Sequence, residues 1–257
     1  MIKDILLISN SKVSGGNYLS HAMNEIDSII GHSKKIVSFI PYANPDGMGY
    51  EKYFQVIKPT FEERGYKINL ISDYPKESIR NAEIIFVGGG NTWHLLKILK
   101  DEGLLHEIKE AVNNGIPYIG SSAGSNVAGL MIGNTNDMPA AECYGREALG
   151  LVPFNINPHY QDTVKLTAEE KIAVLKIAPQ LEIILNHQGE TRDDRLREYH
   201  ALGNNEKIVA LREGAMLRIT HSHIYLKGTS GAKIFQPSKE TLEYSPREEH
   251  NLDFLLE

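Results

Sequence analysis

A run of small residues, Gly120-Ser-Ser-Ala-Gly124, directly follows the apolar residues Tyr118 and Ile119. It fits the pattern Gly-x-Ser-x-Gly, in which a serine sits on a sharp turn between a strand and a helix and exposes its hydroxyl above a sheet. Glycines on both sides let the two backbones approach closely. Ser122 is therefore the candidate nucleophile, although residues of this kind also form ordinary loops. The N–H group of Ala123, at the start of the expected helix, is a candidate donor to an oxyanion.

Short, wholly apolar runs alternate with segments of helical periodicity in the first half of the chain. Ile5–Ile8, Ile36–Ile40 and Ile84–Val87 are typical of buried parallel strands. Apolar residues recur at helical spacing in residues 19–30, 50–64, 93–99 and 104–112, where Pro59 is expected to shorten the second helix. A turn is expected around Pro45 and Gly47. This order predicts an α/β fold with a mostly parallel sheet.

The C-terminal third has a different pattern. Short strands are predicted at Lys207–Leu211, Met216–Ile219, His223–Leu226 and Ala232–Phe235, separated by glycine-containing turns. They predict a small antiparallel β appendage.

A second glycine turn, Gly88-Gly-Gly-Asn-Thr92, follows the apolar strand that ends at Val87. Trp93 stands where a dinucleotide-binding fingerprint requires its third glycine, so that interpretation fails, as does a P-loop. Glycines also let backbone N–H groups approach a ligand. The turn is therefore either the other half of an oxyanion hole or a plain loop.

Another strand-like run, Leu151–Pro158, leads to His159, which is the candidate general base. The polar loop Asn134–Pro139 follows the elbow helix, and loops at this edge of an open α/β sheet carry function. His221 and His223 are two residues apart, so a strand would place both rings on one face, where they could bind a metal. No third ligand is apparent. We therefore expect no metal and interpret them as solvated strand residues.

Two further segments are predicted to be helical. Thr167-x-x-Glu170 has the form of a capping box and opens a helix with apolar positions over Ala168–Ala178, which Pro179 closes. Its pattern suggests an amphipathic lid or an oligomer contact. The densely charged Glu190–Glu198 is typical of a solvated helix face with pairs four residues apart.

Composition limits the partners and the compartment. The 257 residues contain no evident linker, so we expect a single domain over 1–257. A net charge of -6 without any basic run argues against nucleic acid or a membrane surface as partner. The only cysteine, Cys143, excludes an internal disulfide framework. With no signal-peptide pattern, this favours the cytoplasm, and Cys143 remains a candidate for a lone reactive thiol.

Several stretches together resemble peptidase E, the α-aspartyl dipeptidases of the serine peptidase group that also contains cyanophycinases. The matching segments follow the family's order along the chain: Leu6–Ser11, Val87–Thr92, Tyr118–Asn126, Thr135–Pro139, Ile156–His159, Gly189–Arg192 and Glu213-Gly214. The resemblance implies a three-layer α/β/α fold akin to class I glutamine amidotransferases. It also implies cleavage of dipeptides that begin with aspartate.

The same resemblance assigns roles to residues. Ser122 corresponds to the nucleophile, His159 to the base and Glu213 to the carboxylate that orients the base. The N–H groups of Gly90 and Ala123 correspond to the oxyanion hole. Asp137 falls where the family keeps an aspartate near the substrate, and Arg192 where it keeps an arginine suited to the aspartyl carboxylate. Extra residues between His159 and Gly189 depart from the family pattern.

Other functions stay open at the level of sequence. A related hydrolase of larger aspartyl polymers, as cyanophycinases are, is one alternative. A non-catalytic binder of a small acidic ligand is another, although such a binder has no need of Ser122, His159 and Glu213 together. The expected partner is a small dipeptide substrate, no cofactor is needed because water completes deacylation, and a homodimer remains open.

Overall fold

The structure is a computed structural model of the chain. It describes residues 3–31, 35–44, 49–72, 75–162, 166–181, 190–246 and 250–257. The turn expected around Pro45 and Gly47 lies outside these ranges, and so does Gly189 of the segment that ends at Arg192.

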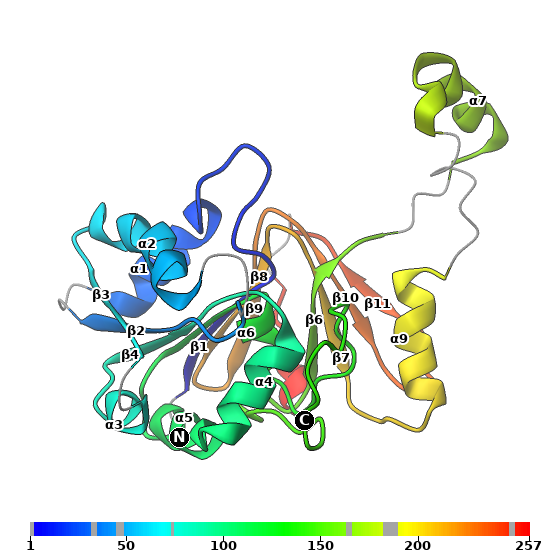
Figure 1. Ribbon diagram of the computed structural model, residues 1–257. Helices are drawn as coiled ribbons and strands as arrows, with labels where there is room; N and C mark the ends of the chain where they lie inside the picture. Colours follow the sequence, from blue (N-terminus) through cyan, green and yellow to red (C-terminus); the bar gives the residue numbers. More distant parts are fainter. Residues whose placement is uncertain are drawn as a thin grey trace.

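A seven-stranded sheet in the order β3-β2-β4-β5-β1-β8-β9 forms the centre of the molecule (Figure 1). Its first five strands are parallel: β3 (Lys67–Leu70), β2 (Ile36–Ile40), β4 (Ile84–Val87), β5 (Tyr118–Ser121) and β1 (Asp4–Ile8). β8 (Ala215–Thr220) pairs antiparallel with β1, and β9 (His223–Gly228) pairs antiparallel with β8. The mostly parallel α/β sheet predicted from the apolar runs is confirmed.

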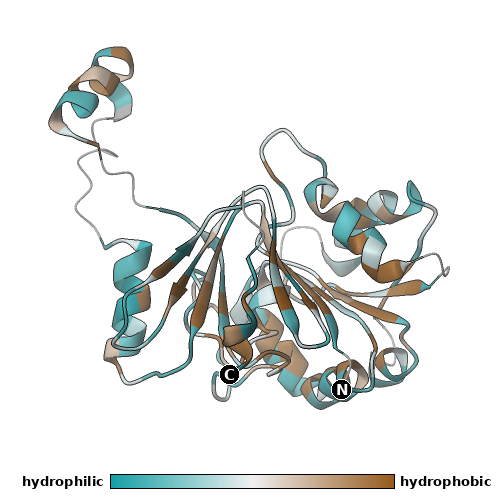
Figure 2. Cartoon of the chain, turned by 180° about the vertical axis from the view of Figure 1, so that it is seen from behind, coloured by the Kyte–Doolittle hydropathy of each residue, from teal (hydrophilic) through white to brown (hydrophobic). Residues whose placement is uncertain are grey.

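Helices cover both faces of this sheet, as a three-layer fold requires. One face carries α1 (Met23–Ile30) and α2 (Gly49–Glu62), and the other carries α3 (Pro75–Arg80), α4 (Thr92–Asp101) and α5 (Leu104–Asn113) (Figure 1). Within β1, Leu6 packs in the cluster that contains α1 and α2, whereas Leu7 packs in the cluster of α4 and α5. Side chains that alternate between two apolar faces explain why β1 is apolar throughout. Figure 2 shows this concentration of apolar residues in the strands.

Two helices differ from the sequence prediction. α2 does not stop at Pro59 but continues to Glu62. Pro59 is exposed, so the carbonyl that loses its helical hydrogen bond lies on the side of α2 that faces solvent. α3 was not predicted, because Ile79 is its only buried residue and so short a helix shows no apolar period.

A second, four-stranded sheet in the order β11-β10-β7-β6 lies beside the first. It consists of β6 (Asn155–Tyr160), β7 (Ile208–Arg212), β10 (Ala232–Phe235) and β11 (Leu242–Tyr244). β6 and β7 are parallel, and the other pairs are antiparallel. Helix α9 (Arg192–Ala201) packs on it through the buried Leu196 and Tyr199. The charged segment is thus a helix, with a pair four residues apart between Arg197 and Asp193.

The predicted C-terminal antiparallel strands are present, but they are divided between the two sheets. β8 and β9 extend the central sheet beyond β1, whereas β10 and β11 extend the second sheet beyond β7. The strand expected at Leu151–Pro158 begins later, at Asn155, and includes His159. Both sheets contribute to one apolar cluster, which contains Leu7 and Val209.

The inserted helix is present as α7 (Ala168–Ile177), and its Thr167–Glu170 capping box is formed. α7 buries none of its residues and Ile177 is 87% exposed, so the helix is not part of either sheet; its expected role as a lid or an oligomer contact stays a prediction. The helix stands apart from both sheets (Figure 1). Short 3₁₀ segments lie at Ser20–Ala22, Pro179–Leu181 and Asp253–Leu256. Among the described residues, no helix combines the length and the apolar character needed to cross a bilayer.

Candidate active site

Ser122 occupies a strained turn between β5 and the short helix α6 (Ala123–Asn126), with φ 54° and ψ −112°. Left-handed φ values are costly for a residue with a side chain. The turn is held by a hydrogen bond from the N–H of Ser122 to the carbonyl of Ile8 (2.9 Å). A Cβ on Gly120 would lie 2.5 Å from the carbonyl oxygen of Gly124, so the close approach requires glycine. The chain therefore forms a nucleophile elbow here.

His159 and Glu213 complete a chain of hydrogen bonds that begins at Ser122. The Nε2 atom of His159 lies 2.9 Å from Oγ of Ser122, and its Nδ1 atom lies 2.8 Å from Oε1 of Glu213. His159 comes from β6, and Glu213 from the turn between β7 and β8. The structure thus brings together the three residues that the sequence singled out for a triad. The arrangement has the connectivity of a serine, a base and an orienting carboxylate.

Two polar residues at the end of β1 support this arrangement, and sequence analysis did not assign them a role. Ser9 is fully buried; its Oγ accepts a hydrogen bond from the N–H of His159 and donates one to the carbonyl of Leu211, both 2.9 Å long. Oδ1 of Asn10 accepts from the N–H of Gly214 (2.7 Å). The sequence signals were that polar residues directly follow a central strand and that both lie in the segment Leu6–Ser11, which resembles the family.

His159 itself has φ 53°, again in the left-handed region, at an irregularity in the pairing of β6 with β7. The hydrogen bond from its N–H to Ser9 helps to hold this strained backbone. Strain at both Ser122 and His159 means that neighbouring contacts, rather than local preference, fix the two side chains.

The two candidate oxyanion donors lie at the ends of neighbouring parallel strands, β4 and β5. Gly90 has φ 140°, and a Cβ there would lie 2.1 Å from the carbonyl oxygen of Ala43. Within the described residues, the N–H groups of Gly90 and Ala123 have no hydrogen-bond acceptor. Because α6 has only four residues, its summed dipole is small, so the N–H of Ala123 matters more than the helix behind it.

A cavity of about 380 Å³ opens over Ser122. Its walls come from residues far apart in the sequence: Ser11, Tyr18, Asn44, Tyr53, Gly89, Gly90, Ser122, Asp137 and His159. The hydroxyl of Tyr53 accepts from the N–H of Gly89 (3.0 Å) and lies 3.1 Å from the hydroxyl of Tyr18. Both tyrosines were missed, because helical spacing had marked Tyr53 only as a core residue.

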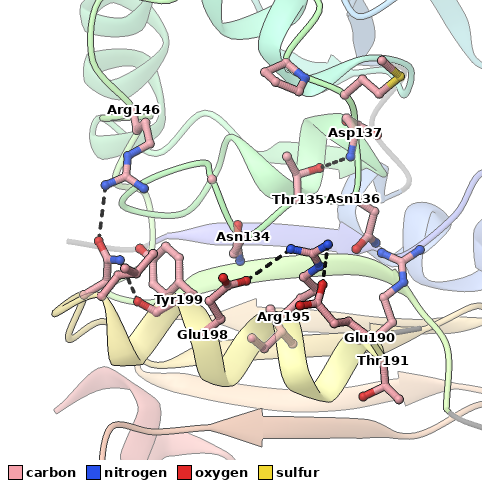
Figure 3. A pocket seen from close by; sticks show the side chains of 17 residues that line it. Asn134, Thr135, Asn136, Asp137, Arg146, Glu190, Thr191, Arg195, Glu198 and Tyr199 are labelled. Carbon is pink, nitrogen blue, oxygen red and sulfur yellow. Dashed lines mark hydrogen bonds and ion pairs between the residues drawn. The ribbon is translucent and has the colours of Figure 1, made fainter. Parts of the chain in front are cut away.

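A second cavity, of about 680 Å³ (Figure 3), shares Asp137 with the first. Arg192, the first residue of α9, also lines the larger one. Oδ2 of Asp137 accepts from the N–H of Thr92 at the start of α4 (2.7 Å). The structure therefore places Asp137 between the two cavities.

The guanidinium of Arg192 is half-buried. Burial lowers its pKa, while the carboxylate of Asp137 and the hydroxyl of Tyr160 act in the opposite direction. No hydrogen bond or ion pair joins this guanidinium to another residue in the described ranges. A cation in such a position can accept a carboxylate from a ligand.

The other candidates from the sequence are not placed for chemistry. His221 lies in the turn before β9 and His223 begins that strand, where its Nδ1 lies 2.7 Å from Oδ2 of Asp253. No group of three or more metal-ligating side chains occurs in the part of the chain that the structure describes. Burial raises the pKa of Cys143, whose Sγ donates to the carbonyl of Trp93 (3.0 Å), so its thiolate is disfavoured.

Comparison with known proteins agrees with this architecture. A crystal structure of a peptidase from an acI-B1 Actinobacterium superposes with a TM-score of 0.69 and 16% identity, covering 98% of each chain, which shows a shared fold. A protein of Nostoc sp. named "Peptidase E" is 41% identical over 259 residues, or 100% of this chain and 98% of that protein. A Drosophila melanogaster protein named "Probable alpha-aspartyl dipeptidase" is 38% identical, over 99% of this chain and 98% of that protein. Residues 5–227 match the peptidase family S51. The chain therefore belongs to peptidase family S51.

Proposed function

We propose that this peptidase is an α-aspartyl dipeptidase that cleaves dipeptides with an N-terminal aspartate through an acyl-enzyme. The observation that carries the proposal is the continuous hydrogen-bonded chain from Ser122 through His159 to Glu213, with separations of 2.9 and 2.8 Å. Ser122 and His159 line a cavity that the carboxylate of Asp137 also lines. The adjoining cavity is lined by Asp137 and Arg192.

In the first half-reaction, Oγ of Ser122 attacks the carbonyl carbon of the substrate while Nε2 of His159 takes the hydroxyl proton. Glu213 accepts the Nδ1–H bond and stabilises the imidazolium that forms. The negative oxygen of the tetrahedral intermediate faces the N–H groups of Gly90 and Ala123, each worth on the order of 3 kcal/mol in the barrier. His159 then gives its proton to the leaving amine as the C–N bond breaks, and the acyl group stays on Ser122.

In the second half-reaction, His159 takes a proton from water as the water oxygen attacks the acyl ester. Collapse of the second tetrahedral intermediate breaks the bond to Ser122, whose Oγ recovers the proton from His159. The products are free aspartate and the second amino acid.

The charges of the two adjoining cavities account for the choice of substrate. The side-chain carboxylate of an N-terminal aspartate pairs with Arg192, and its free ammonium group pairs with Asp137. An N-blocked dipeptide loses the pair with Asp137. An asparaginyl dipeptide loses the pair with Arg192. Their absence makes both compounds poor substrates.

The test compares Asp-Leu with Asn-Leu and N-acetyl-Asp-Leu, with cyanophycin included as the polymer alternative. Ser122→Ala is expected to lower kcat on Asp-Leu by on the order of a millionfold. Ser121→Ala is the matched control, because the hydroxyl of Ser121 is buried without a hydrogen-bond partner among the described residues. Its activity should stay within about twofold of wild type. Preference for the polymer, or full activity of Ser122→Ala, would reject the proposal.

A further inference from the structure

A cluster of five charged side chains and one tyrosine hydroxyl lies on the second sheet and at the start of α9. We call it the charge cluster; it consists of Tyr160, Asp162, Asp193, Arg212, Lys233 and Glu243. Three of its members are chain neighbours of residues at the proposed site: Tyr160 follows His159, Asp193 follows Arg192, and Arg212 precedes Glu213. Along a strand, successive side chains point to opposite faces. Tyr160 packs against Leu196 and Tyr199, so the cluster lies on the side of β6 and β7 that α9 covers.

Lys233 joins three elements at the centre of this cluster. From β10, its Nζ donates to the hydroxyl of Tyr160 (2.9 Å) and pairs with Oδ1 of Asp162 (3.0 Å) and Oδ2 of Asp193 (3.5 Å). Its side chain is only 15% exposed. Burial by itself lowers the pKa of Lys233, but the hydrogen bonds to Tyr160 and Asp162 raise it overall, so the ammonium stays charged.

Tyr160 carries the connection to α9. Its ring is almost fully buried and its hydroxyl donates to Oδ1 of Asp193. The ammonium of Lys233 lies over the same ring, 5.2 Å from its centre. Arg212 closes the cluster on the other side, with two hydrogen bonds to Asp162 (2.5 and 2.9 Å) and one to Glu243 (2.6 Å).

Isolated ion pairs at the surface contribute little to stability. The charge cluster differs from such pairs. Several partners contact the ammonium of the largely buried Lys233 and the buried ring of Tyr160, and these shared contacts fix the geometry of the cluster. Asp193 lies in the first turn of α9, next to Arg192, and no ion pair with a described residue holds the guanidinium of Arg192 itself. The backbone of that first turn therefore sets the position from which the Arg192 side chain extends.

We propose that Lys233 and Tyr160 are positioning residues for substrate selection. By holding Asp193, they fix the first turn of α9 and keep Arg192 in place to receive a carboxylate. The inference rests on the proposed function, in which Arg192 binds the aspartyl side chain. It predicts that breaking the cluster changes the choice between aspartyl and asparaginyl dipeptides while leaving the nucleophile intact.

The experiment measures kcat/KM for Asp-Leu and Asn-Leu, together with the rate at which a small fluorophosphonate labels Ser122. Lys233→Met keeps the stem and removes the charge, and should lower the Asp-Leu to Asn-Leu ratio by about tenfold. Labelling should stay within about twofold of wild type. Lys233→Arg should restore most of the ratio. Lys239→Met, an exposed lysine in the loop after β10, is the matched control and should change neither measurement.

Tyr160→Phe provides a second route, because it keeps the ring and removes the hydroxyl that donates to Asp193 and accepts from Lys233; it should lower the ratio in the same direction. If Lys233→Met does not fold, this variant decides. A ratio that stays at the wild-type value in Tyr160→Phe overturns the inference, and so does an equal loss of both substrates together with slower labelling. Failure of the proposed function is seen separately, since wild-type enzyme would then not prefer Asp-Leu at all.

Discussion

Ser9 offers the sharpest test of how the site is held together. Its hydroxyl bridges two strands of the second sheet, accepting from the N–H of His159 and donating to the carbonyl of Leu211. Ser9→Ala removes this partner from both backbone groups, of which Leu211 is fully buried and His159 partly buried. Each unpaired group costs about 1–3 kcal/mol, so we expect a loss of about 2–4 kcal/mol once partial relaxation is allowed for.

For a protein of this size, that loss corresponds to a fall in Tm of about 5–15 °C by scanning calorimetry. The Asp-Leu kcat/KM should fall by about ten- to a hundredfold, because small displacements of a catalytic group are costly. Ser28→Ala is the control: the exposed Ser28 also donates to a backbone carbonyl, that of Glu25 (2.7 Å), yet its loss should shift Tm by less than about 2 °C. Equal Tm values for the two variants would refute the reasoning.

Three further perturbations have definite expected results. Tyr53→Phe removes the acceptor of the Gly89 N–H next to the proposed oxyanion donor, so kcat should fall about five- to twentyfold with little change in KM; a purely structural role would lower Tm and leave kcat unchanged. Arg212 lowers the pKa of Asp162 to about 2 from its usual 3.8, so this carboxylate stabilises the fold above pH 3.8 and the contribution is lost as pH falls through about 2. The Tm advantage of wild type over Asp162→Asn should therefore shrink between pH 5 and pH 2, and a constant difference would contradict the assignment. Incubation with EDTA should leave hydrolysis of Asp-Leu unchanged, whereas inactivation that zinc reverses would require a metal in the mechanism.

The central sheet could be predicted because its information is local. Ile84–Val87 and Tyr118–Ser121 are apolar or small throughout, each ends in a glycine turn, and each is followed by a helix, which leaves few alternatives to buried parallel strands. Parallel strands bring their carboxyl ends to one edge, so Gly90 and Ser122 were expected to lie near each other. Their catalytic roles remain predictions until activity is measured.

The second sheet was not predictable in the same way. No feature of the sequence Asn155–Tyr160 indicates that it pairs with Ile208–Arg212, about 50 residues later, rather than with a strand of the central sheet. The choice depends on packing that involves many elements at once. The supporting contacts of Ser9, Tyr53 and Lys233 were missed for the same reason, since serine, tyrosine and lysine are common at positions that have no such contacts.

For α7, the local structure could be predicted from the sequence, but its packing could not. Its capping box was predicted correctly, because that motif is contained within four residues. No other described element buries its apolar residues. Apolar residues at helical spacing become buried only where another element covers them, so the lid or oligomer contact stays a prediction.

The contacts that hold the site span almost the whole chain. The hydrogen bond from Gly214 to Asn10 connects residues 204 positions apart, and that from Ser9 to Leu211 connects residues 202 positions apart. During synthesis on the ribosome, the strand that carries Ser9 emerges long before its partners exist. His159 therefore has no fixed position until β7 and the turn to β8 have been translated and have docked. If His159 is the base, as proposed, a nascent chain that lacks β7 and β8 should be inactive, and the appearance of activity during translation should follow the formation of these long-range contacts.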